Sequence, residues 1–556
     1  PRHSGTDEVD TIDVMDPLRS MSNFGGLTTI EDTLRGKLYG IYQNGIVQID
    51  PNTGAIEYLF RDLQEYNWLQ CLNPVLDKRG VIWMATFRGL YRFDPFQRKL
   101  TLVRTADPEM RALIGTLKWT TIDRGGTIWV GTAGYGLLKY DQRIERFHNV
   151  ADNSIRALAP TKDGQLLVSR YDNYLSIYDP ASRRYSTLVR SVEDQWPDVG
   201  AKLVTQFADM TVQDRDGNYW SFISSGTLTR YDPVAGKLEL VQPEIAPGER
   251  DGGFHYPLCI GIDGSLWCGG DKALWRIDTR TKACTPHPWP VPVVNNPYPF
   301  TTALHQGADG IVWVGTVKGL LRSDPAAGTW KSYTHVPDDA NSLSVETVFS
   351  ICPDPVDPLH VLWIGTNGGG VNRFDVPTGK FTRFTTHEGL PNDVVYGVLS
   401  DDRGCLWMST NKGIARYDPR ARTFRNFNVG DGLQSDEFNR HAYCKDAKGW
   451  LYFGGVSGFN YFDPHALEQD STPVVVRITG IRLINKPVRF GAPGSPLQQP
   501  VHLSTGMEIP YSANMVTFTF ATMEFAAPEQ HQYRYMLEGF DAGWIDAGTD
   551  HSAVYT

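Results

Sequence analysis

A repeated segment most constrains the fold of this 556-residue chain. Each copy has a short apolar run, a Gly-bearing turn and a closing aspartate, and Ile311–Leu320 and Cys405–Ile414 begin two clear copies. The aspartates follow one another at intervals of 38 to 53 residues and are Asp50, Asp94, Asp141, Asp179, Asp232, Asp278, Asp324, Asp375, Asp418 and Asp463. Ten copies at this period are typical of propeller blades, each a four-stranded antiparallel sheet.

A large side chain recurs at one position of the expected second strand. Seven copies have a tryptophan there, namely Trp83, Trp129, Trp220, Trp267, Trp313, Trp363 and Trp407. The other three copies have Tyr39, Leu167 and Tyr452. A flat ring at this position can fill the wedge between neighbouring blades. The apolar pattern has a period near two, so the sequence predicts an all-β propeller and not a helical solenoid.

The division of the ten blades among rings stays open between two arrangements. Rings usually have four to eight blades, which favours a seven-bladed ring over residues 152–466 after three blades of a second ring over residues 1–151. The alternative is one ten-bladed ring. The last copy has no outer strand of its own after Asp463. Residues Ile144–Asn149 would supply that strand in a seven-bladed ring, and Val9–Met15 in a ten-bladed ring.

The blade pattern ends near Pro473, and a different β domain is expected over residues 473–556. Two runs read as strands without blade spacing, Val474–Thr479 and Met515–Phe520. A Tyr-x-Tyr-x-Leu-Glu-Gly-Phe-Asp motif follows from Tyr533. A strand starting near Thr556 would have no partner, so we expect this domain to be truncated.

Composition and motifs exclude several classes of function. The net charge of −10 gives no electrostatic footprint for nucleic acid or anionic membranes. No apolar run reaches the length of a membrane span, and no signal peptide opens the chain. No Cys-x-x-Cys pair, nucleophile elbow, zinc-protease motif or phosphate loop occurs, so we expect no metal, no cofactor and no catalysis. A propeller lyase or glycoside hydrolase, and a protein-interaction scaffold, remain as alternatives.

The repeat resembles a known family. The Trp-Val-Gly-Thr-x-x-Gly-Leu blades, as at Trp313, resemble the two-component-regulator propeller repeat, and Gly432–Asn439 resembles the entry loop of its last blade. The motif from Tyr533 to Trp544 resembles the immunoglobulin-like β-sandwich named for three tyrosines. The chain departs from the family pattern in having fewer than fourteen blades and nothing after Thr556.

The resemblance implies a sensor. Such propellers form the extracytoplasmic region of membrane proteins, on the periplasmic or extracellular side of a bacterial inner membrane. The membrane contact would then be made by a missing C-terminal segment, followed by a histidine kinase or diguanylate cyclase. The resemblance also implies an oligosaccharide or other small-molecule ligand and a possible homodimer.

The candidate ligand residues lie mainly in loops that lead from one blade to the next. Such loops gather at one face of a propeller and at its channel mouth. Aromatic rings there can stack on sugars, and Arg, Asn and His can hydrogen-bond to hydroxyl or carboxylate groups. The candidates are Arg440, His441, His255, Tyr256, Tyr298, His387, Asn392 and Trp119. Arg440 with His441 is the sharpest pair, because both precede an expected inner strand.

The sequence allows a cross-strand disulfide between Cys259 and Cys268. The two cysteines flank the turn at Asp263 and Gly264. If these are the two central turn residues, Cys259 lies opposite Cys268, and an oxidising compartment would allow the bond. A longer turn would shift the register and separate the two cysteines.

Overall fold

Antiparallel sheets form nearly all of the regular structure, which confirms the expected all-β propeller class. The computed structural model describes residues 28–42, 45–61, 73–86, 88–103, 112–171, 175–189, 207–223, 228–235, 237–241, 254–270, 273–290, 301–467, 475–525, 528 and 531–556. The chain divides into two compact units. One comprises residues 143–469, and the other comprises residues 1–142 and 470–556.

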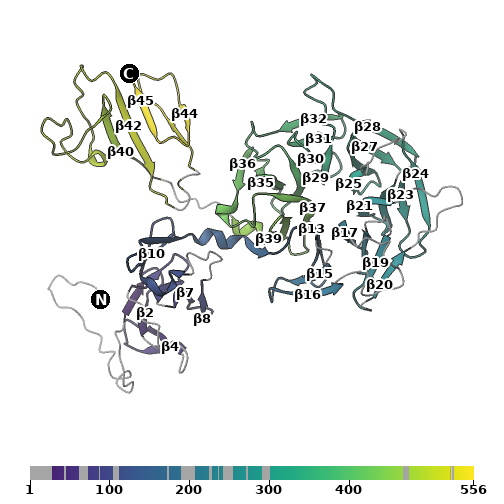
Figure 1. The fold of residues 1–556 in the computed structure, drawn as a ribbon, viewed down its shortest axis with the longest axis horizontal. Coiled ribbons are helices and arrows are strands. Elements are labelled where there is room, and N and C mark those ends of the chain that lie inside the picture. The colour runs from purple at the N-terminus through teal and green to yellow at the C-terminus, as the bar shows by residue number, and fades with distance from the viewer. Residues whose placement is uncertain are drawn as a thin grey trace. The chain divides into compact units, whose positions relative to one another are not determined.

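Seven of the described sheets form a closed ring within residues 143–469 (Figure 1). The innermost strand of each sheet contacts its two counterparts, and the last inner strand, β37, contacts the first, β13. The inner strands are β13 (Ile155–Pro160), β17 (Phe207–Gln213), β21 (Phe254–Ile260), β25 (Thr301–Gln306), β29 (Val348–Pro353), β33 (Val395–Ser400) and β37 (Phe438–Lys445). The first and last sheets share a core that includes Ile155, Leu158, Ala442 and Phe459.

Each sheet then runs outward from the centre in chain order. The second strands are β14 (Leu166–Arg170), β18 (Tyr219–Ile223), β22 (Leu266–Gly270), β26 (Val312–Thr316), β30 (Val361–Thr366), β34 (Leu406–Thr410) and β38 (Leu451–Gly455). The third strands are β15 (Leu175–Asp179), β19 (Leu228–Asp232), β23 (Ala273–Ile277), β27 (Gly319–Asp324), β31 (Val371–Asp375), β35 (Gly413–Asp418) and β39 (Gly458–Phe462). Six sheets end in β16 (Arg184–Val189), β20 (Lys237–Val241), β24 (Cys284–Pro288), β28 (Thr329–Tyr333), β32 (Lys380–Phe384) and β36 (Thr423–Phe427).

The seventh sheet takes its outer strand from the chain that precedes the ring. β12 (His148–Ala151) pairs antiparallel with β39 and places His148 opposite Tyr461. Before β12, the short 3-10 helix η2 (Gln142–Arg146) occupies part of the segment expected as strand. Phe147 links the two elements, and its buried ring lies 4.8 Å from that of Phe462, centroid to centroid. The alternative closing segment, residues 9–15, lies outside the described residues.

The recurrent tryptophan is held by an aspartate in the turn before it. Trp407 is fully buried against residues of the next blade, and its indole N–H donates to Asp401 Oδ2 at 2.9 Å. Asp401 Oδ1 accepts the backbone N–H groups of Arg403 and Cys405 at 3.0 and 2.9 Å. The same indole–carboxylate bond joins Asp77 to Trp83, Asp123 to Trp129, Asp214 to Trp220 and Asp354 to Trp363. The ring therefore packs between blades as expected, and one carboxylate fixes both the turn and the core side chain.

The closing aspartates shape the turn between the third and outer strands. Asp278 Oδ1 accepts the backbone N–H groups of Arg280 and Thr281 at 2.9 and 2.7 Å. Asp94, Asp232 and Asp418 hold their turns in the same way. An aspartate that accepts hydrogen bonds from residues two and three positions ahead stabilises a reversal of the chain.

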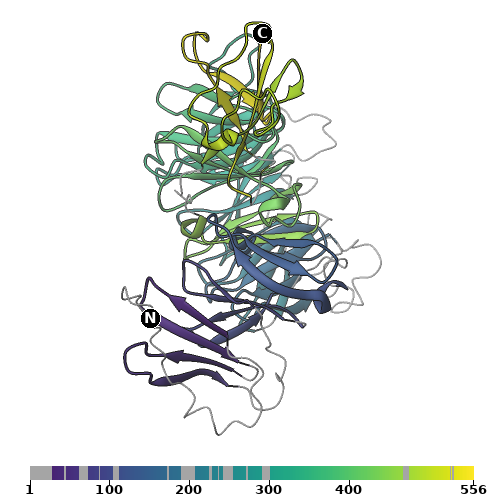
Figure 2. The same ribbon diagram turned by 90° about the vertical axis from the view of Figure 1, so that its left-hand side faces the viewer.

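Three further sheets precede the ring, and the first of them is drawn in purple in Figure 2. Two have four strands, β1 (Thr28–Asp32), β2 (Lys37–Tyr42), β3 (Gly45–Ile49) and β4 (Ile56–Arg61), then β5 (Val75–Leu76), β6 (Ile82–Thr86), β7 (Gly89–Asp94) and β8 (Lys99–Leu102). The third has β9 (Leu117–Ile122), β10 (Ile128–Thr132) and β11 (Leu137–Tyr140), after the short η1 (Ile114–Thr116). Trp83 packs with Leu117 and Ile128, so neighbouring sheets share a core as blades do.

The C-terminal residues form a sheet without the blade pattern. Its order is β41 (Lys486–Pro487), β40 (Val476–Leu483), β42 (Val516–Thr522) and β45 (Ser552–Tyr555). A two-stranded sheet accompanies it, β43 (Tyr533–Tyr535) with β44 (Ile545–Gly548). The short 3-10 helix η6 (Val501–Leu503) belongs to this region, whereas η4 (Val429–Asp431) and η5 (Pro464–Leu467) belong to residues 143–469. The assignment of this domain to the three-tyrosine β-sandwich stays a prediction.

Candidate functional site

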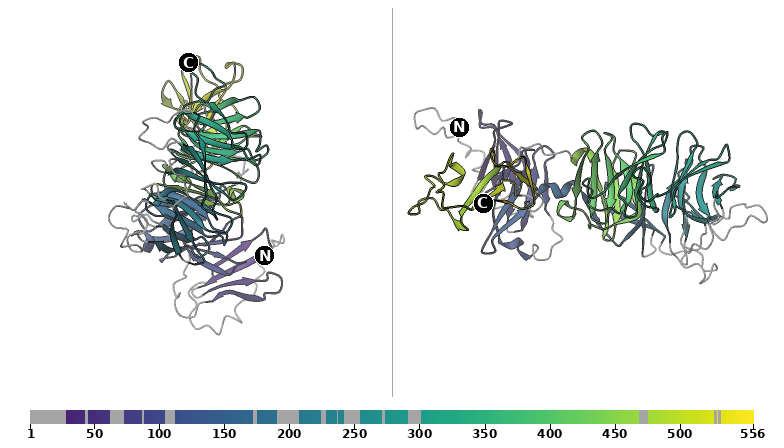
Figure 3. Two further views of the ribbon diagram at one scale, coloured as in Figure 1. Left: turned by 90° about the vertical axis from the view of Figure 1, so that its right-hand side faces the viewer. Right: turned by 90° about the horizontal axis from the view of Figure 1, so that it is seen from above.

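All seven inner strands begin at one face of the ring, called the mouth below. Each follows a loop that crosses from the outer edge of one blade to the centre of the next, so the loops gather on that face. Figure 3 (right panel) shows the ring edge-on, with strands running between its two faces. The Asp-bearing turns that hold the tryptophans lie at the opposite ends of the inner strands.

A β-bulge interrupts the first residues of every inner strand in the ring. The register shifts skip Arg156 in β13, Phe349 in β29 and Tyr396 in β33. In β37 the shift is wider and spans residues 439–442. A bulge bends the strand and changes the direction of its side chains, so the side chains at these positions leave the alternation of a regular strand.

Three side chains from consecutive blades meet at the mouth. The Phe349 and Tyr396 rings are stacked, with centroids 5.6 Å apart and planes at 18°. The guanidinium carbon of Arg440 lies 5.4 Å from the Phe349 centroid. The electron-rich face of the ring attracts the guanidinium, and this contact orients Arg440 on an aromatic platform.

A second guanidinium–aromatic pair lies on the next blade of the ring. The guanidinium carbon of Arg156 lies 4.2 Å from the centroid of Tyr171, a residue that is 49% exposed. The Asn439 amide donates to the Ile155 carbonyl at 2.7 Å and to the Ser154 hydroxyl at 3.0 Å. This amide ties the backbone beside Arg440 to the backbone beside Arg156. We call Arg156, Tyr171, Phe349, Tyr396 and Arg440 the rim cluster.

The pKa of the Tyr396 phenol depends on its burial and on the charged groups around it. Burial raises the pKa of Tyr396, and the charge of Glu437 adds to that effect, whereas Arg440 and a hydrogen bond to Asn411 oppose it. The hydroxyl donates to Asn411 Oδ1 at 2.8 Å. The phenol is therefore neutral at physiological pH, and the rim combines aromatic faces, an amide and charged groups.

His441 lies deeper and bridges the centre of the ring. Its side chain is only 3% exposed, and its Nε2 lies 2.9 Å from the Thr302 carbonyl oxygen. Because a carbonyl can only accept, Nε2 carries the proton of this hydrogen bond. Thr302 belongs to β25, in the fourth blade, whereas His441 belongs to the seventh. The backbone of His441 has φ of 65°, a left-handed conformation that costs a non-glycine residue about 1–2 kcal/mol.

The structure gathers only part of the predicted site. Arg440 and His441 lie at the mouth as expected, although His441 contacts protein and is buried. His387 is exposed beside Glu388, and Asn392 accepts the backbone N–H of Val394 at 2.8 Å, which braces its own loop. The backbone of residues 255 and 256 belongs to β21, but the side chains of His255 and Tyr256, and all of Tyr298, lie outside the described residues.

Trp119 lies in β9 of the N-terminal unit, not in the ring. Its side chain is 42% exposed and covers Gly131, where an added Cβ would lie 2.7 Å from the indole nitrogen. Gly131 is therefore small because Trp119 rests on it. Trp119 therefore packs within its own sheet.

The predicted disulfide between Cys259 and Cys268 is wrong. Both cysteines are free, and the register pairs Cys259 with Trp267 and Leu258 with Cys268. Five residues separate the last pair, Ile260 and Leu266, so the turn is longer than the two-residue turn assumed. A register shift of one residue places the two sulfur atoms on opposite faces of the sheet.

The prediction from the connecting loops did not include Arg156, Tyr171, Phe349 and Tyr396, because three of them lie in inner strands and Tyr171 directly follows β14. Aligning the repeats on the starts of the inner strands places Arg156, Thr302, Phe349 and Tyr396 at one position. Each is the extra residue of a bulge. The alignment was therefore a usable signal, although the bulges themselves have no mark in the sequence.

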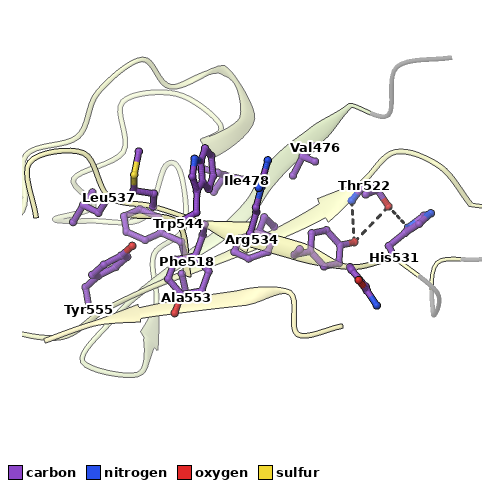
Figure 4. A pocket seen from close by; sticks show the side chains of 15 residues that line it. Val476, Ile478, Phe518, Thr522, His531, Arg534, Leu537, Trp544, Ala553 and Tyr555 are labelled. Atoms are coloured by element: carbon purple, nitrogen blue, oxygen red, sulfur yellow. Dashed lines mark hydrogen bonds between the residues drawn. The ribbon is translucent and has the colours of Figure 1, made fainter. Parts of the chain in front are cut away.

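The C-terminal sheet carries a separate apolar groove of about 690 Å³ (Figure 4). Residues of β40, β42 and β45 form its floor, and Arg534 lies 5.1 Å from the centroid of Trp544 at its edge. Asp541 accepts from the Tyr555 hydroxyl at 2.7 Å, and burial together with that carboxylate raises the pKa of Tyr555 to about 12. At the other end His531 contacts both Thr522 and Glu524.

The described residues include neither a membrane-spanning helix nor a cluster of metal ligands. None of the helices there is long and apolar enough to cross a bilayer. Within the same residues, no group of three or more His, Cys, Asp and Glu side chains is arranged to hold a metal ion.

Comparison with known proteins supports the resemblance seen in the repeat. Residues 389–412 match the family described as two component regulator propeller, which confirms the identification of the repeat. Histidine kinase P4 of Formosa agariphila is 22% identical over 340 residues, which are 51% of this chain and 24% of that protein. The chain therefore spans about a quarter of the length of this curated relative.

Solved structures with a similar fold include extracellular domains of putative two component and one component systems. The extracellular domain of a putative hybrid two component system of B. thetaiotaomicron matches with a TM-score of 0.63 and 18% identity, covering 95% of this chain and 73% of that one. The extracellular domain of a putative one component system of the same organism has a TM-score of 0.46 and 18% identity, over 96% and 71%. The first match supports the fold alone at this level of identity.

Proposed function

We propose that this chain is the non-catalytic, ligand-sensing extracytoplasmic region of a membrane-bound signal-transduction protein. It lies on the periplasmic or extracellular side of a bacterial inner membrane and recognises an oligosaccharide at the mouth of the seven-sheet ring. Binding favours one arrangement of the chain over another and is relayed to a cytoplasmic histidine kinase or diguanylate cyclase. A ligand can transmit a signal in this way only if it binds the two arrangements with different affinities.

The observation that carries the proposal is the rim cluster. The half-buried Tyr396 ring is stacked on the buried Phe349 ring, and Arg440 lies over Phe349 with hydrogen-bond donors in the plane of its guanidinium. Asn411 adds an exposed amide bonded to Tyr396. Flat apolar faces combined with planar polar groups are the means by which a protein surface can bind both faces and hydroxyls of a sugar ring. The propeller repeat at residues 389–412, in the blade of Tyr396, supports the sensor class.

Titration of the chain with oligosaccharides, by calorimetry and by thermal shift, tests the proposal. Binding should raise the unfolding temperature by mass action, and chromatography of the mixture should show unchanged saccharide. Tyr396→Ala should weaken binding about tenfold because a stacking face is lost. Tyr396→Phe keeps the ring and loses only the bond to Asn411, so it serves as the matched control.

Two outcomes would contradict the proposal. A new saccharide product would assign the chain to a propeller enzyme. Binding that is equally strong in Tyr396→Ala and the native chain would place the ligand elsewhere than the rim cluster.

A further inference from the structure

We infer that the sheet of β9, β10 and β11, called the third sheet below, is a docking surface for the C-terminal sheet, and that Phe525 is the residue that docks. The contact is a joint that can open, and both of its sides belong to the unit that comprises residues 1–142 and 470–556. This inference goes beyond the proposed function, because it involves neither the mouth of the ring nor a ligand.

The docking surface is the face of the third sheet on which the recurrent tryptophan lies. Trp129 is paired with Lys139, and Gly131 is paired with Trp119 and with Leu137. Paired residues of antiparallel strands share a face, as do residues two positions apart in one strand. Trp119, Trp129, Leu137 and Lys139 therefore lie on the same face, which we call the docking face.

In other sheets the face that carries the tryptophan packs against the next blade. Trp83 packs against Ile128 of the third sheet, and Trp407 packs against Phe453 of the seventh blade of the ring. The blade that follows the third sheet in the chain is the first blade of the ring, whose core is shared with the seventh blade instead. Trp129 is accordingly only half-buried, whereas Trp83 and Trp407 are fully buried.

Residues that follow β42 cover part of the docking face. The Phe525 ring meets the Trp129 ring edge-on, with centroids 6.3 Å apart and planes at 74°, which is a favourable arrangement of two aromatic rings. The Lys139 ammonium donates to the Phe525 carbonyl at 3.3 Å. In the turn before Trp129, an added Cβ at Gly125 would lie 3.7 Å from Glu524 Cγ. Phe525 thus supplies an apolar contact of the kind that the next blade supplies elsewhere.

The segment that carries Phe525 is ordered by polar contacts of its own. His531 Nε2 lies 2.7 Å from Glu524 Oε2, and His531 Nδ1 lies 2.5 Å from Thr522 Oγ1. These contacts tie the residue before Phe525 to the end of β42. A side chain presented on an ordered segment loses less conformational entropy when it docks.

The joint covers the docking face incompletely. Trp119 and Leu137 are 42% and 55% exposed, and Phe525 itself is 44% exposed. Permanent interfaces bury such side chains in an apolar core. A contact that buries little apolar surface opens at a low cost in free energy, so the C-terminal sheet can leave the docking face without unfolding.

A disulfide trap in the whole chain tests the docking. Gly125→Cys with Glu524→Cys brings two thiols within reach of a bond when the joint is closed. Mild oxidation should therefore produce a link that peptide mass mapping assigns to positions 125 and 524. Gly115→Cys with Glu524→Cys is the matched control and should stay reduced, because nothing lies within 4 Å of an added Cβ at Gly115.

A third substitution in the trap assigns the docking to one ring. Phe525→Ala should slow formation of the link about tenfold, because the aromatic contact that favours the closed joint is lost. Phe490→Ala removes another exposed ring of the C-terminal region, between β41 and η6, and should leave the rate unchanged.

Acetylation of lysines gives a second measurement that needs no introduced cysteine. Lys139 should react more slowly than Lys118, an exposed residue of β9, because the Lys139 amine is bonded to the Phe525 carbonyl. Phe525→Ala should accelerate the acetylation of Lys139 severalfold and leave that of Lys118 unchanged. Mass spectrometry of the acetylated peptides measures both rates in one sample.

The two measurements together decide the inference. If no link forms and Lys139 reacts as fast as Lys118, the C-terminal sheet does not dock on this face. If the link forms equally fast in the Phe525→Ala variant, Phe525 is not the docking residue. Neither result depends on saccharide binding, so a failure of this inference is distinguishable from a failure of the proposed function.

Discussion

At the scale of single residues, the turn aspartate that precedes the recurrent tryptophan in several blades has a larger role than the sequence pattern indicated. Asp401 accepts three hydrogen bonds, two from its turn and one from the buried indole of Trp407. The Trp267 indole has no such carboxylate in its turn, because Gly261 takes the place of the aspartate in its blade. An added Cβ at Gly261 would lie 2.7 Å from Gln306 Oε1, and that oxygen accepts the Ile262 N–H at 2.9 Å.

Replacing Asp401 should destabilise the ring measurably. Asp401→Ala leaves the Trp407 indole and two backbone N–H groups without their acceptor, so the free energy of unfolding should fall by about 1–3 kcal/mol. Asp401→Asn keeps one oxygen and should cost less. Urea denaturation followed by tryptophan fluorescence measures both variants. Equal stability of the alanine variant and the native chain would show that water replaces the carboxylate at no cost.

At the scale of elements, the outer turns and the closing strand each contribute to the free energy of unfolding in a way that depends on pH, and the two pH ranges differ. Backbone N–H groups of the turn lower the pKa of Asp278 and of Asp50. The pKa values of Asp179 and Asp375 are lowered first by the hydroxyls of Ser182 and Thr378 and then by backbone N–H groups. These carboxylates bind a proton less readily in the folded state. Their contribution is complete above the ordinary pKa of 3.8 and is lost as the pH falls below it.

Acid should therefore weaken the fold through these turns. The urea midpoint of the native chain should decline as the pH falls from about 4. A quadruple variant with Asn at positions 50, 179, 278 and 375 should decline less steeply, since Asn retains the turn geometry without titrating. Parallel curves for the two proteins would show that other carboxylates dominate.

The closing strand responds at a higher pH. His148 of β12 stacks on Tyr461 and Trp450, with centroids 4.7 and 5.5 Å away. Burial, and then the charge of Arg183, lower its pKa from 6.5. The unfolded state therefore binds the proton more readily, so stability is complete above 6.5 and is lost as the pH falls below it.

His148→Phe should remove part of that loss. His287 and His305 also have pKa values lowered by burial, so the informative quantity is the difference between the native chain and the variant. The unfolding free energy of the variant should change less between pH 7.5 and 5.5. A variant with the full native pH dependence would assign the effect to the other two histidines.

At the scale of the whole molecule, the ring depends on a strand that precedes its first blade. A fragment of residues 143–469 retains β12 and should fold with a closed ring. A fragment of residues 152–469 lacks both β12 and Phe147, a buried side chain whose loss alone costs about 3–5 kcal/mol. Denaturation of the two fragments should differ by at least that amount. Equal stability would show that closure by β12 contributes little.

Sequence patterns predicted the blades well because their periodic residues act locally. The recurrent Trp and the closing Asp occur once in each blade and make their contacts nearby in the sequence. The repeat therefore predicted the order of the strands and the turns. The turn after Cys259 was misjudged because turn length, and with it register, is not marked by Gly264 alone. Arg440 was predicted, but Phe349 and Tyr396 were missed, because they meet Arg440 only through the packing of three consecutive blades and their bulges.

The hydrogen bond from His441 to Thr302 has a mechanical consequence. It joins the fourth and the seventh blades, which lie almost opposite each other in the ring. The buried His441 side chain therefore lies between the inner strands of these two blades. A displacement of either inner strand at this level should strain the bond to the other.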